Sequence, residues 1–347
     1  MADVQIADVA KLAQVSVSTV SNVLNGRINR MRPETLQRVN DAIKTLGYQP
    51  NVVARSLKTG RAPMLGLLVP SIASPFFALL ASEMERVALA HGYRMLLGNT
   101  HRDVQKETDL LEDFFAYGIR GVVTGSSLPT EDHYRPLVDR GLVLVSFDRR
   151  GAPGSTLPVD YVSIDNFHAG YGATRHLIEH GHREIAFVTA PAGTVSRIER
   201  RRGYEAAMAE SGLSLDVIQL SLQTLYADGE LAEVGRQMGR EIAKRSHRPT
   251  GIVAMSDMIA IGMLAGLHDN HVVVPRDISL VGIDDLFLDA LISPTITSMR
   301  QPLPEMAEAM VTRLVERLGD STLTGTERVF RPELVKRNSV RALTKAG

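Results

Sequence analysis

The sequence predicts an α/β protein in which a small helical head precedes a larger body built from two doubly wound parallel sheets. Three observations lead to this fold class. Residues 6–46 hold three short segments whose apolar residues follow helical spacing. From residue 63, short runs rich in Val, Ile and Leu alternate with amphipathic segments, as is typical of parallel strands covered by helices. That alternation occurs in two successive sets, so we expect the body to have two lobes.

Composition narrows the class of protein. The chain has 347 residues, of which 44% are hydrophobic and 22% charged, so we expect two or three folded domains. It has no cysteine, which excludes disulfides and thiolate metal sites and agrees with a reducing compartment. We find no signal-like opening and no apolar run near the ~18 residues that span a bilayer. We therefore expect a cytoplasmic protein with no membrane partner.

The net charge of zero conceals an asymmetry between head and body. Residues 1–61 contain nine Lys or Arg and four Asp or Glu, a formal charge of +5, so the rest of the chain carries −5. A small basic head on a mildly acidic body indicates that the head binds a polyanion.

The head reads as three helices. The first covers residues 6–13, and a short break at Gln14 and Val15 separates it from a second at 17–24, for which we expect Ser16 to be the N-cap. The third begins with Pro33 and stops at Gly47.

The second of these segments, VSTVSNVL, has no charged residue. Short uncharged side chains allow a helix to approach base edges in a major groove, while flanking cations contact phosphates. Three helices with a tight break after the first match helix-turn-helix geometry. A small helical bundle without DNA is the alternative interpretation of the same pattern.

The stretch PNVVARSLKTG, residues 50–60, is too short to be a stable helix by itself. One interpretation is a plain interdomain linker. The other is a segment that folds only on DNA, with Leu57 inserted into a base step of the minor groove.

Strands of the body are expected at 64–70, 94–100, 121–126, 142–147, 184–190, 251–257 and 278–284. Helices are expected at 75–92, 105–118, 167–180, 197–211, 230–245 and 257–269. In open α/β sheets a ligand binds beyond the carboxyl ends of the strands, so the residues that follow each strand are candidates. They are Ser71, Ser74, Phe76, Phe77, Asp148, Arg149, Arg150, Ser196, Arg200, Ser256, Asp257, Asp284 and Asp285.

Aromatic faces combined with Asp, Arg and Ser suit a sugar, because rings stack on sugar faces and charged groups bind hydroxyls. Several of these residues also have structural interpretations. One of Phe76 and Phe77 can belong to the core, Asp257 and Asp285 are expected to cap helices, and Arg200 lies in a run, ERRR, that is commonly a solvated face.

The sequence favours no catalytic or metal chemistry. His176, His180 and His182 have some metal-like spacing, but they fall at a helix end followed by a strand start. There is no G-x-S-x-G elbow and no phosphate-binding glycine loop. We expect neither an enzyme nor a cofactor.

Longer motifs show a resemblance that covers the full chain. QIADVAKLAQVSVSTVSNVLNG and RPETLQRVNDAIKTLGYQPNVVARSLKTG in the head, and GLLVPSIASPFFALL, HLIEHGHREIAFVTA, RRRGY, SDMIAIGML and PRDISLVGIDD in the body, occur in order. They resemble the lactose-repressor (LacI/GalR) family of bacterial transcription regulators. The resemblance implies operator DNA as a partner and a body like the periplasmic sugar-binding proteins.

By position, the resemblance places Val17 and Ser18 at the start of the recognition helix and Leu57 where the family's hinge leucine enters the operator. Asn22 stands where the family often has an arginine or histidine, and it could instead bind adenine. The DNA-binding candidates are Ile6, Ser16, Val17, Ser18, Thr19, Ser21, Asn22, Asn25, Ala54, Arg55, Leu57 and Lys58.

The effector-binding candidates are Phe76, Phe77, Asp148, Arg149, Ser196, Arg200, Ser256 and Asp284. Two departures from the family argue against copying one member's ligand. Ser256 stands where an asparagine is common, and Leu303 stands where some sugar-binding members have an aromatic residue.

The expected domains are a helix-turn-helix domain at 1–50, a hinge at 51–62, and an effector-binding and dimerisation domain at 63–347. We expect an N-lobe of about 63–163 and 294–326 and a C-lobe of about 164–293 and 327–347, with crossings near 162–165, 291–294 and 325–329. The C-terminal stretch has no leucine heptad, so a homodimer is expected.

The function expected is a repressor of a palindromic operator, controlled by a small sugar or sugar acid. Alternatives are a member that uses a purine or a phosphoprotein partner as corepressor and, in a different class, a pure solute-binding protein.

Overall fold

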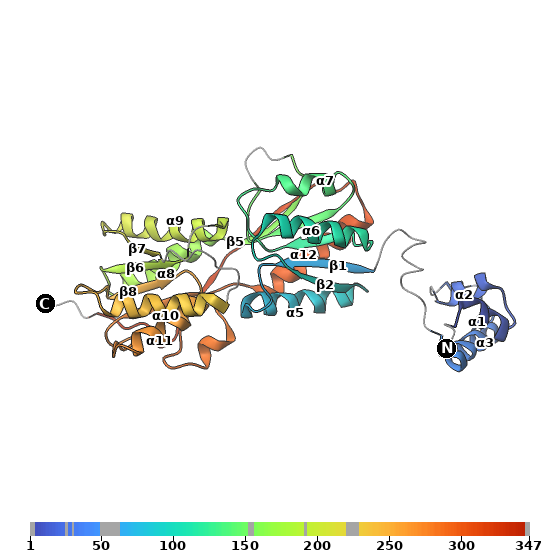
Figure 1. The fold of residues 1–347 in the computed structure, drawn as a ribbon, viewed down its shortest axis with the longest axis horizontal. Helices are drawn as coiled ribbons and strands as arrows, with labels where there is room; N and C mark the ends of the chain where they lie inside the picture. Colours follow the sequence, from blue (N-terminus) through green and yellow to red (C-terminus); the bar gives the residue numbers. More distant parts are fainter. Residues whose placement is uncertain are drawn as a thin grey trace. The chain divides into compact units, whose positions relative to one another are not determined.

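The structure is a computed structural model that describes residues 4–24, 27–29, 31–48, 63–151, 156–190, 193–219 and 229–343 (Figure 1). The chain divides into two compact units, Met1–Ala62 and Pro63–Gly347, which we call the head and the body. Among the described residues, no helix combines the length and the apolar character needed to cross a bilayer.

The head contains three helices, α1 (Ile6–Leu12), α2 (Val17–Leu24) and α3 (Pro33–Leu46). Val9, Val20 and Val39, one from each helix, are fully buried at their meeting point. The sequence prediction of these three helices is confirmed, including the left-handed Gly47 that ends α3.

The turn between α1 and α2 is tight because Gln14 adopts a left-handed conformation with φ of 53°. The Ser16 side chain then accepts a hydrogen bond from the Thr19 amide at 3.2 Å, which confirms it as the N-cap of α2.

The first sheet of the body has the order β11-β5-β4-β3-β1-β2, and all its strand pairs are parallel. Figure 1 shows α5 and α12 on one face of this sheet and α6 and α7 on the other. Its elements are β1 (Met64–Val69), α5 (Pro75–Ala90), β2 (Arg94–Asn99), α6 (Val104–Ala116), β3 (Gly121–Thr124), η1 (Asp132–Tyr134), α7 (Arg135–Val138), β4 (Val143–Phe147), β5 (Asp160–Ile164), α12 (Leu303–Gly319) and β11 (Glu327–Phe330).

The second sheet has the order β12-β10-β9-β8-β6-β7, with only β12 antiparallel to its neighbour. The helices α8 and α9 pair with each other, and so do α10 and α11 (Figure 1). Its elements are α8 (Asn166–Glu179), β6 (Ile185–Thr189), α9 (Val195–Glu210), β7 (Asp216–Gln219), α10 (Gly229–Ala243), β8 (Gly251–Ala254), α11 (Asp257–His268), β9 (Ser279–Asp284), η2 (Phe287–Ala290), β10 (Thr297–Arg300) and β12 (Glu333–Val335).

The strand order corrects two of the expected lobe boundaries. The first crossing, after β5, lies near the expected 162–165. The second follows β10 at Arg300 rather than 291–294, because β10 pairs with β9 of the C-lobe. The third follows β11 at Phe330 rather than 325–329, because β11 pairs with β5 of the N-lobe. Segment 294–300 therefore belongs to the C-lobe, and 327–330 belongs to the N-lobe.

Two helix pairs of the C-lobe pack backbone against backbone through glycines. A Cβ at Gly262 of α11 would lie 1.8 Å from the Ala232 carbonyl oxygen of α10, and one at Gly266 would lie 2.0 Å from that of Arg236. Similarly, a Cβ at Gly170 of α8 would lie 1.9 Å from the Arg200 carbonyl oxygen of α9. Glycine is thus required by the closeness of the helices.

We predict that Gly262→Ala destabilises the body by ~3 kcal/mol, because backbone cannot move aside as a flexible side chain could. Gly319→Ala is the matched control, since nothing lies within 4 Å of a Cβ at that helix end. The midpoint of thermal unfolding should fall by several degrees for the first variant and not for the second. Equal midpoints would show that α10 and α11 separate at little cost.

His176 lies in the last turn of α8, and His182 follows that helix, as the sequence predicts. His182 is fully buried, with its two ring nitrogens 3.1 Å from the Thr250 hydroxyl and from the Arg341 carbonyl oxygen. Burial, with smaller contributions from neighbouring positive groups, lowers the pKa of His176 from 6.5 to about 4. No cluster of three or more potential metal ligands occurs among the described residues.

The lowered pKa of His176 predicts that the body becomes less stable in acid. The folded state binds this proton more weakly than the unfolded chain, so the stabilisation is present above pH 6.5 and is lost as the pH falls from 6.5 toward 4. Between pH 6.5 and 4.5, wild type should lose about 2 kcal/mol more unfolding free energy than His176→Gln. Denaturant titrations at each pH measure this, with the surface variant His91→Gln as control; parallel curves for wild type and His176→Gln would contradict it.

Candidate functional site

The exposed face of α2 carries only uncharged side chains. Val17 is 45% exposed, and Ser18 and Asn22 are also exposed, whereas Val20 turns into the head core. The Ser16 hydroxyl lies 2.7 Å from that of Ser18, which holds the start of this face in place. Such a face can approach base edges without placing a buried charge there.

The other predicted DNA-binding residues are distributed around this face. Thr19, Ser21 and Ile6 are half-buried beside it, with the Thr19 hydroxyl 2.9 Å from that of Ser16. The remaining five, Asn25, Ala54, Arg55, Leu57 and Lys58, lie outside the described residues.

The body contains a cavity of about 60 Å³, partly open to solvent, lined by residues from both lobes. Seven of the eight predicted effector-binding residues line it: Phe76, Phe77, Asp148, Ser196, Arg200, Ser256 and Asp284. They come from the segments that follow β1, β4, β6, β8 and β9, because the carboxyl ends of parallel strands meet at one edge of a sheet.

Arg149 is the exception, and its assignment to the cavity is corrected. Its Nε lies 3.2 Å from Glu131 Oε1 with both side chains buried, and its Nη1 donates to the Leu128 carbonyl oxygen at 2.5 Å. Tyr161 donates to the other Glu131 oxygen at 2.8 Å. Because successive residues after a strand point in opposite directions, Asp148 faces the cavity and Arg149 is held inside the N-lobe.

Four cavity-wall residues and Asn166, which lies behind them, form a continuous polar chain between the lobes. Asn166, at the start of α8, donates from Nδ2 to Asp148 Oδ1 at 2.8 Å and accepts from Arg200 Nε at 2.8 Å. Arg200 Nη1 lies 3.6 Å from Asp284 Oδ1, which also accepts from Gln301 Nε2 at 2.7 Å. The alternative interpretation of Arg200 as a solvated residue is wrong, since it is 8% exposed.

Asp284 occupies an unusual position at the end of β9. Its φ is 138°, and Asp148 has a φ of 63°, so both carboxyl groups are presented by strained turns. Burial raises the pKa of Asp284 well above its ordinary value, opposed by the nearby Arg200 guanidinium. Strained backbone and a perturbed carboxyl in one cavity are typical of a functional site.

Among the described residues of the cavity wall, two buried side-chain oxygens lack hydrogen-bond partners. They are the Ser256 hydroxyl oxygen and Gln301 Oε1, on residues that are 7% and 4% exposed. A buried polar atom without a partner is costly, so these atoms are suited to bind a polar ligand.

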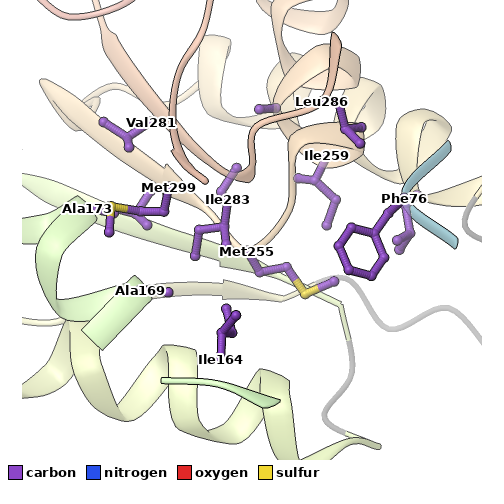
Figure 2. Close-up of a cluster of buried hydrophobic side chains, with 14 of the residues drawn as sticks. Phe76, Ile164, Ala169, Ala173, Met255, Ile259, Val281, Ile283, Leu286 and Met299 are labelled. Atoms are coloured by element: carbon purple, nitrogen blue, oxygen red, sulfur yellow. The ribbon is translucent and has the colours of Figure 1, made fainter. Parts of the chain in front are cut away.

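The remaining wall is apolar and combines both lobes. Phe76 and Phe77 pack edge to face with ring centroids 5.2 Å apart, and Phe76 also stacks on Phe147. Figure 2 shows Phe76 pointing toward Met255, which follows β8 in the other lobe. Phe76 therefore belongs both to the core and to the cavity wall.

Ser127 joins the two lobes directly. It has a φ of 52°, and its hydroxyl donates to the Asp148 carbonyl oxygen at 2.7 Å. Its own carbonyl oxygen accepts from the Val195 amide at 3.0 Å, and its hydroxyl oxygen accepts from the Ser196 amide at 3.4 Å. This residue of the N-lobe thus fixes the beginning of α9, which carries Ser196 and Arg200.

The expected capping roles of Asp257 and Asp285 are wrong. Asp257 is fully buried and accepts from Ser298 Oγ at 2.7 Å and from the Leu286 amide at 3.0 Å. Asp285 pairs with Arg300 and with Arg337.

Sequence reasoning missed six residues of the wall. Ser74, which the sequence analysis placed after the first strand but not among the effector-binding candidates, also lines the cavity. The missed residues are Arg102, Arg197, Leu231, Met255, Met258 and Gln301.

Comparison with known proteins accounts for both units. Residues 5–51 match the family model of bacterial regulatory proteins of the lacI family, and residues 174–340 match a periplasmic binding protein-like domain. The regulator RegA of Clostridium saccharobutylicum is 34% identical over 335 residues, which are 96% of this chain and 98% of RegA. The chain belongs to the LacI family. It is a DNA-binding transcriptional regulator, and regulators of this family are not enzymes.

Further regulators are similar to this LacI-family chain in sequence or in structure. The repressor PurR of Aliivibrio fischeri (strain MJ11) is 33% identical over 338 residues, 96% of this chain and 98% of PurR. A complex of the regulator CelR with cellobiose superposes with a TM-score of 0.68 at 28% identity, covering 97% of this chain and 99% of CelR. The lac repressor dimer bound to operator and the anti-inducer ONPF has a TM-score of 0.85 at 21% identity, covering 98% and 100%, and shows the shared fold.

The structural role of Arg149 gives a prediction. Arg149→Met should destabilise the body by about 3 kcal/mol, because it leaves Glu131 buried without its cation. Adding Glu131→Gln removes the unpaired charge and should recover more than half of the loss. Urea denaturation of the single and double variants tests this; a double variant no more stable than Arg149→Met would refute the pairing.

Proposed function

We propose that this regulator is a repressor that binds a palindromic operator as a homodimer and responds to a small sugar or sugar-acid effector. The observation that carries the proposal is the effector cavity. Its described residues combine an aromatic wall, two strained strand-end carboxyl groups and two buried side-chain oxygens without partners.

The DNA half of the proposal rests on α2. Its uncharged exposed face lies in the major groove, where Ser18 and Asn22 contact base edges and Thr19, Ser21 and Asn25 contact phosphates. The hinge residues Ala54, Arg55, Leu57 and Lys58 occupy the adjacent minor groove, with Leu57 inserted at the operator centre.

Homodimer formation is supported by apolar side chains on the body surface. Phe287 and Leu291 are 58% and 74% exposed in and after η2. Leu89 of α5 and Leu97 of the edge strand β2 are 52% and 41% exposed. Exposed apolar patches mark protein contacts, and a two-fold dimer matches the symmetry of a palindromic operator.

Effector control follows from the position of the cavity between the lobes. A ligand that binds one arrangement of the lobes better than another shifts their equilibrium, and linkage makes the coupling with operator affinity reciprocal at ~1–3 kcal/mol. We propose that the hinge is the two-state element. We propose that the repressor acts in the cytoplasm, because its operator DNA lies there.

The test is selection of operator fragments from random DNA by the full chain, followed by titration of candidate effectors. Hexoses, hexuronates, purines and a histidine-phosphorylated carrier protein should be compared for their effect on operator affinity. A sugar or sugar acid that changes affinity supports the proposal, whereas a purine or a required protein partner favours the alternatives. Lack of a salt-sensitive preference for any palindrome would refute it.

We predict that Asn22→Ala lowers affinity for the selected operator by about 1–3 kcal/mol, because one base contact is lost. Affinity for random DNA should change little, since phosphate contacts remain. Fluorescence anisotropy on both duplexes measures the ratio. Gln37→Ala, on the exposed side of α3, is the control; an unchanged specificity ratio in Asn22→Ala would place this residue away from the bases.

A further inference from the structure

Two aspartates of the C-lobe form a buried carboxyl pair outside the effector cavity. Asp257 is the first residue of α11 and Asp289 lies in η2, and neither side chain is exposed to solvent. A side-chain hydrogen bond joins the two carboxyl groups. A Cβ at Gly282 of β9 would lie 2.0 Å from Asp257 Oδ1, so the sheet has room for the pair because this position is glycine.

The hydrogen-bond donors around the pair are unequally divided. Asp257 accepts from Ser298 Oγ at 2.7 Å and from the Leu286 amide at 3.0 Å. With both carboxyl groups ionised, neither side-chain oxygen of Asp289 has a donor among the described residues. Two carboxyl groups can form a hydrogen bond with each other only if one of them holds a proton. Because buried like charges in contact do not both remain ionised, the pair requires at least one proton.

The charged groups around Asp289 are negative or already paired. Asp284 and Asp285, at the end of β9, add negative charge near its carboxyl group. Arg337, which follows β12, is a nearby cation, but its Nη2 donates to Asp285 Oδ1 at 2.5 Å. Arg300 of β10 also pairs with Asp285, at 2.6 Å. The rest of α11 and η2 contains no Asp, Glu, Lys or Arg.

The segment that carries Asp289 otherwise faces solvent. Phe287 and Leu291 are 58% and 74% exposed. The turn is short, and the Leu291 amide closes it by donating to the Leu288 carbonyl oxygen at 2.9 Å. A 3₁₀ turn of this length has few internal hydrogen bonds, so the contact between Asp289 and Asp257 contributes to its attachment to the body.

We propose that protons held by the Asp257–Asp289 pair fasten η2 to the body, so that this segment opens more readily as the pH rises. When η2 opens, Asp289 passes into water, where a carboxyl group releases its proton at lower pH. The consequence for assembly rests on the proposed function, because Phe287 and Leu291 are proposed as part of the homodimer surface. Opening of η2 withdraws these side chains from the partner.

The direction of the effect follows from burial. Burial raises the pKa of Asp257 well above its ordinary value, and the neighbouring Asp289 raises it further. Burial also raises the pKa of Asp289 from 3.8 to about 6, opposed by the hydrogen bond with Asp257. The closed segment therefore binds protons more tightly than the open one. The stabilisation from Asp289 is present below pH 3.8 and is lost as the pH rises through 6, which is opposite in sign to the effect of His176.

Hydrogen exchange of the full chain at about pH 5 and pH 7.5 tests the proposal. Protection of the amides between residues 286 and 296, corrected for the intrinsic exchange rate, should be at least about tenfold lower at the higher pH. Asp289→Asn cannot titrate and can still donate to Asp257, so its protection should change less than about threefold. Asp113→Asn, exposed on α6, is the matched control and should behave as wild type. Equal pH dependence in wild type and Asp289→Asn would overturn the proposal.

Infrared spectroscopy detects the proton in the wild-type protein. At neutral pH we expect the carbonyl stretching band of a buried protonated carboxyl group, and Asp257→Asn should remove part of it. A wild-type spectrum without such a band would overturn the proposal, and so would a band that is unchanged in Asp257→Asn.

Sedimentation at the same two pH values tests the consequence for assembly. The wild-type dimer should be at least about threefold weaker at the higher pH, whereas the Asp289→Asn dimer should be equally strong at both. The same pH dependence in the two proteins would overturn control of the dimer by this pair. A chain that is monomeric at both pH values would refute the proposed homodimer, and hydrogen exchange would still decide whether the pair fastens η2.

Discussion

The Arg200 guanidinium, 8% exposed, is the interaction on which the geometry of the body's cavity depends. It holds Asn166 at the start of α8, the Met255 carbonyl oxygen after β8 at 2.7 Å and, at longer range, Asp284 after β9. Through Asn166 it reaches Asp148 of the other lobe. A buried cation is costly unless several acceptors surround it. The Arg200 guanidinium therefore fixes the strand ends that carry its acceptors relative to one another.

Close helix packing makes that arrangement possible. Gly170 lets α8 approach the Arg200 carbonyl oxygen on α9, and Gly203 lets α9 approach that of Phe167 on α8. With any larger side chain, α9 would move away from α8 and the guanidinium would no longer reach Asn166. The small residues of this lobe therefore contribute to the site without lining it. Ser127 contributes from the other lobe by binding the first amides of α9.

The head and the body differ in where their charged side chains lie. In the head, α2 exposes short uncharged side chains, and the cations lie elsewhere in the unit. In the body, several charges are buried and paired with one another, as Arg200 is with Asp284 and Arg149 is with Glu131. Binding of DNA and binding of a small ligand thus use opposite placements of charge, one on the flanks and one at the centre.

Periodicity and turn residues in the sequence determined most of the fold. Pro33 and Gly47 bounded α3, and the apolar runs located the seven main parallel strands, because these patterns act through local backbone preferences. They also located seven cavity residues, since a parallel sheet brings the carboxyl ends of its strands together whatever the loops contain.

The tertiary structure decided the contacts that local sequence patterns do not determine. It assigned β10 and β11 to their sheets by pairing partners distant in sequence, turned Arg149 inward onto Glu131, and brought Arg102, Arg197 and Gln301 to the wall. Which partner a side chain meets depends on contacts between segments far apart along the chain, and no local pattern records them.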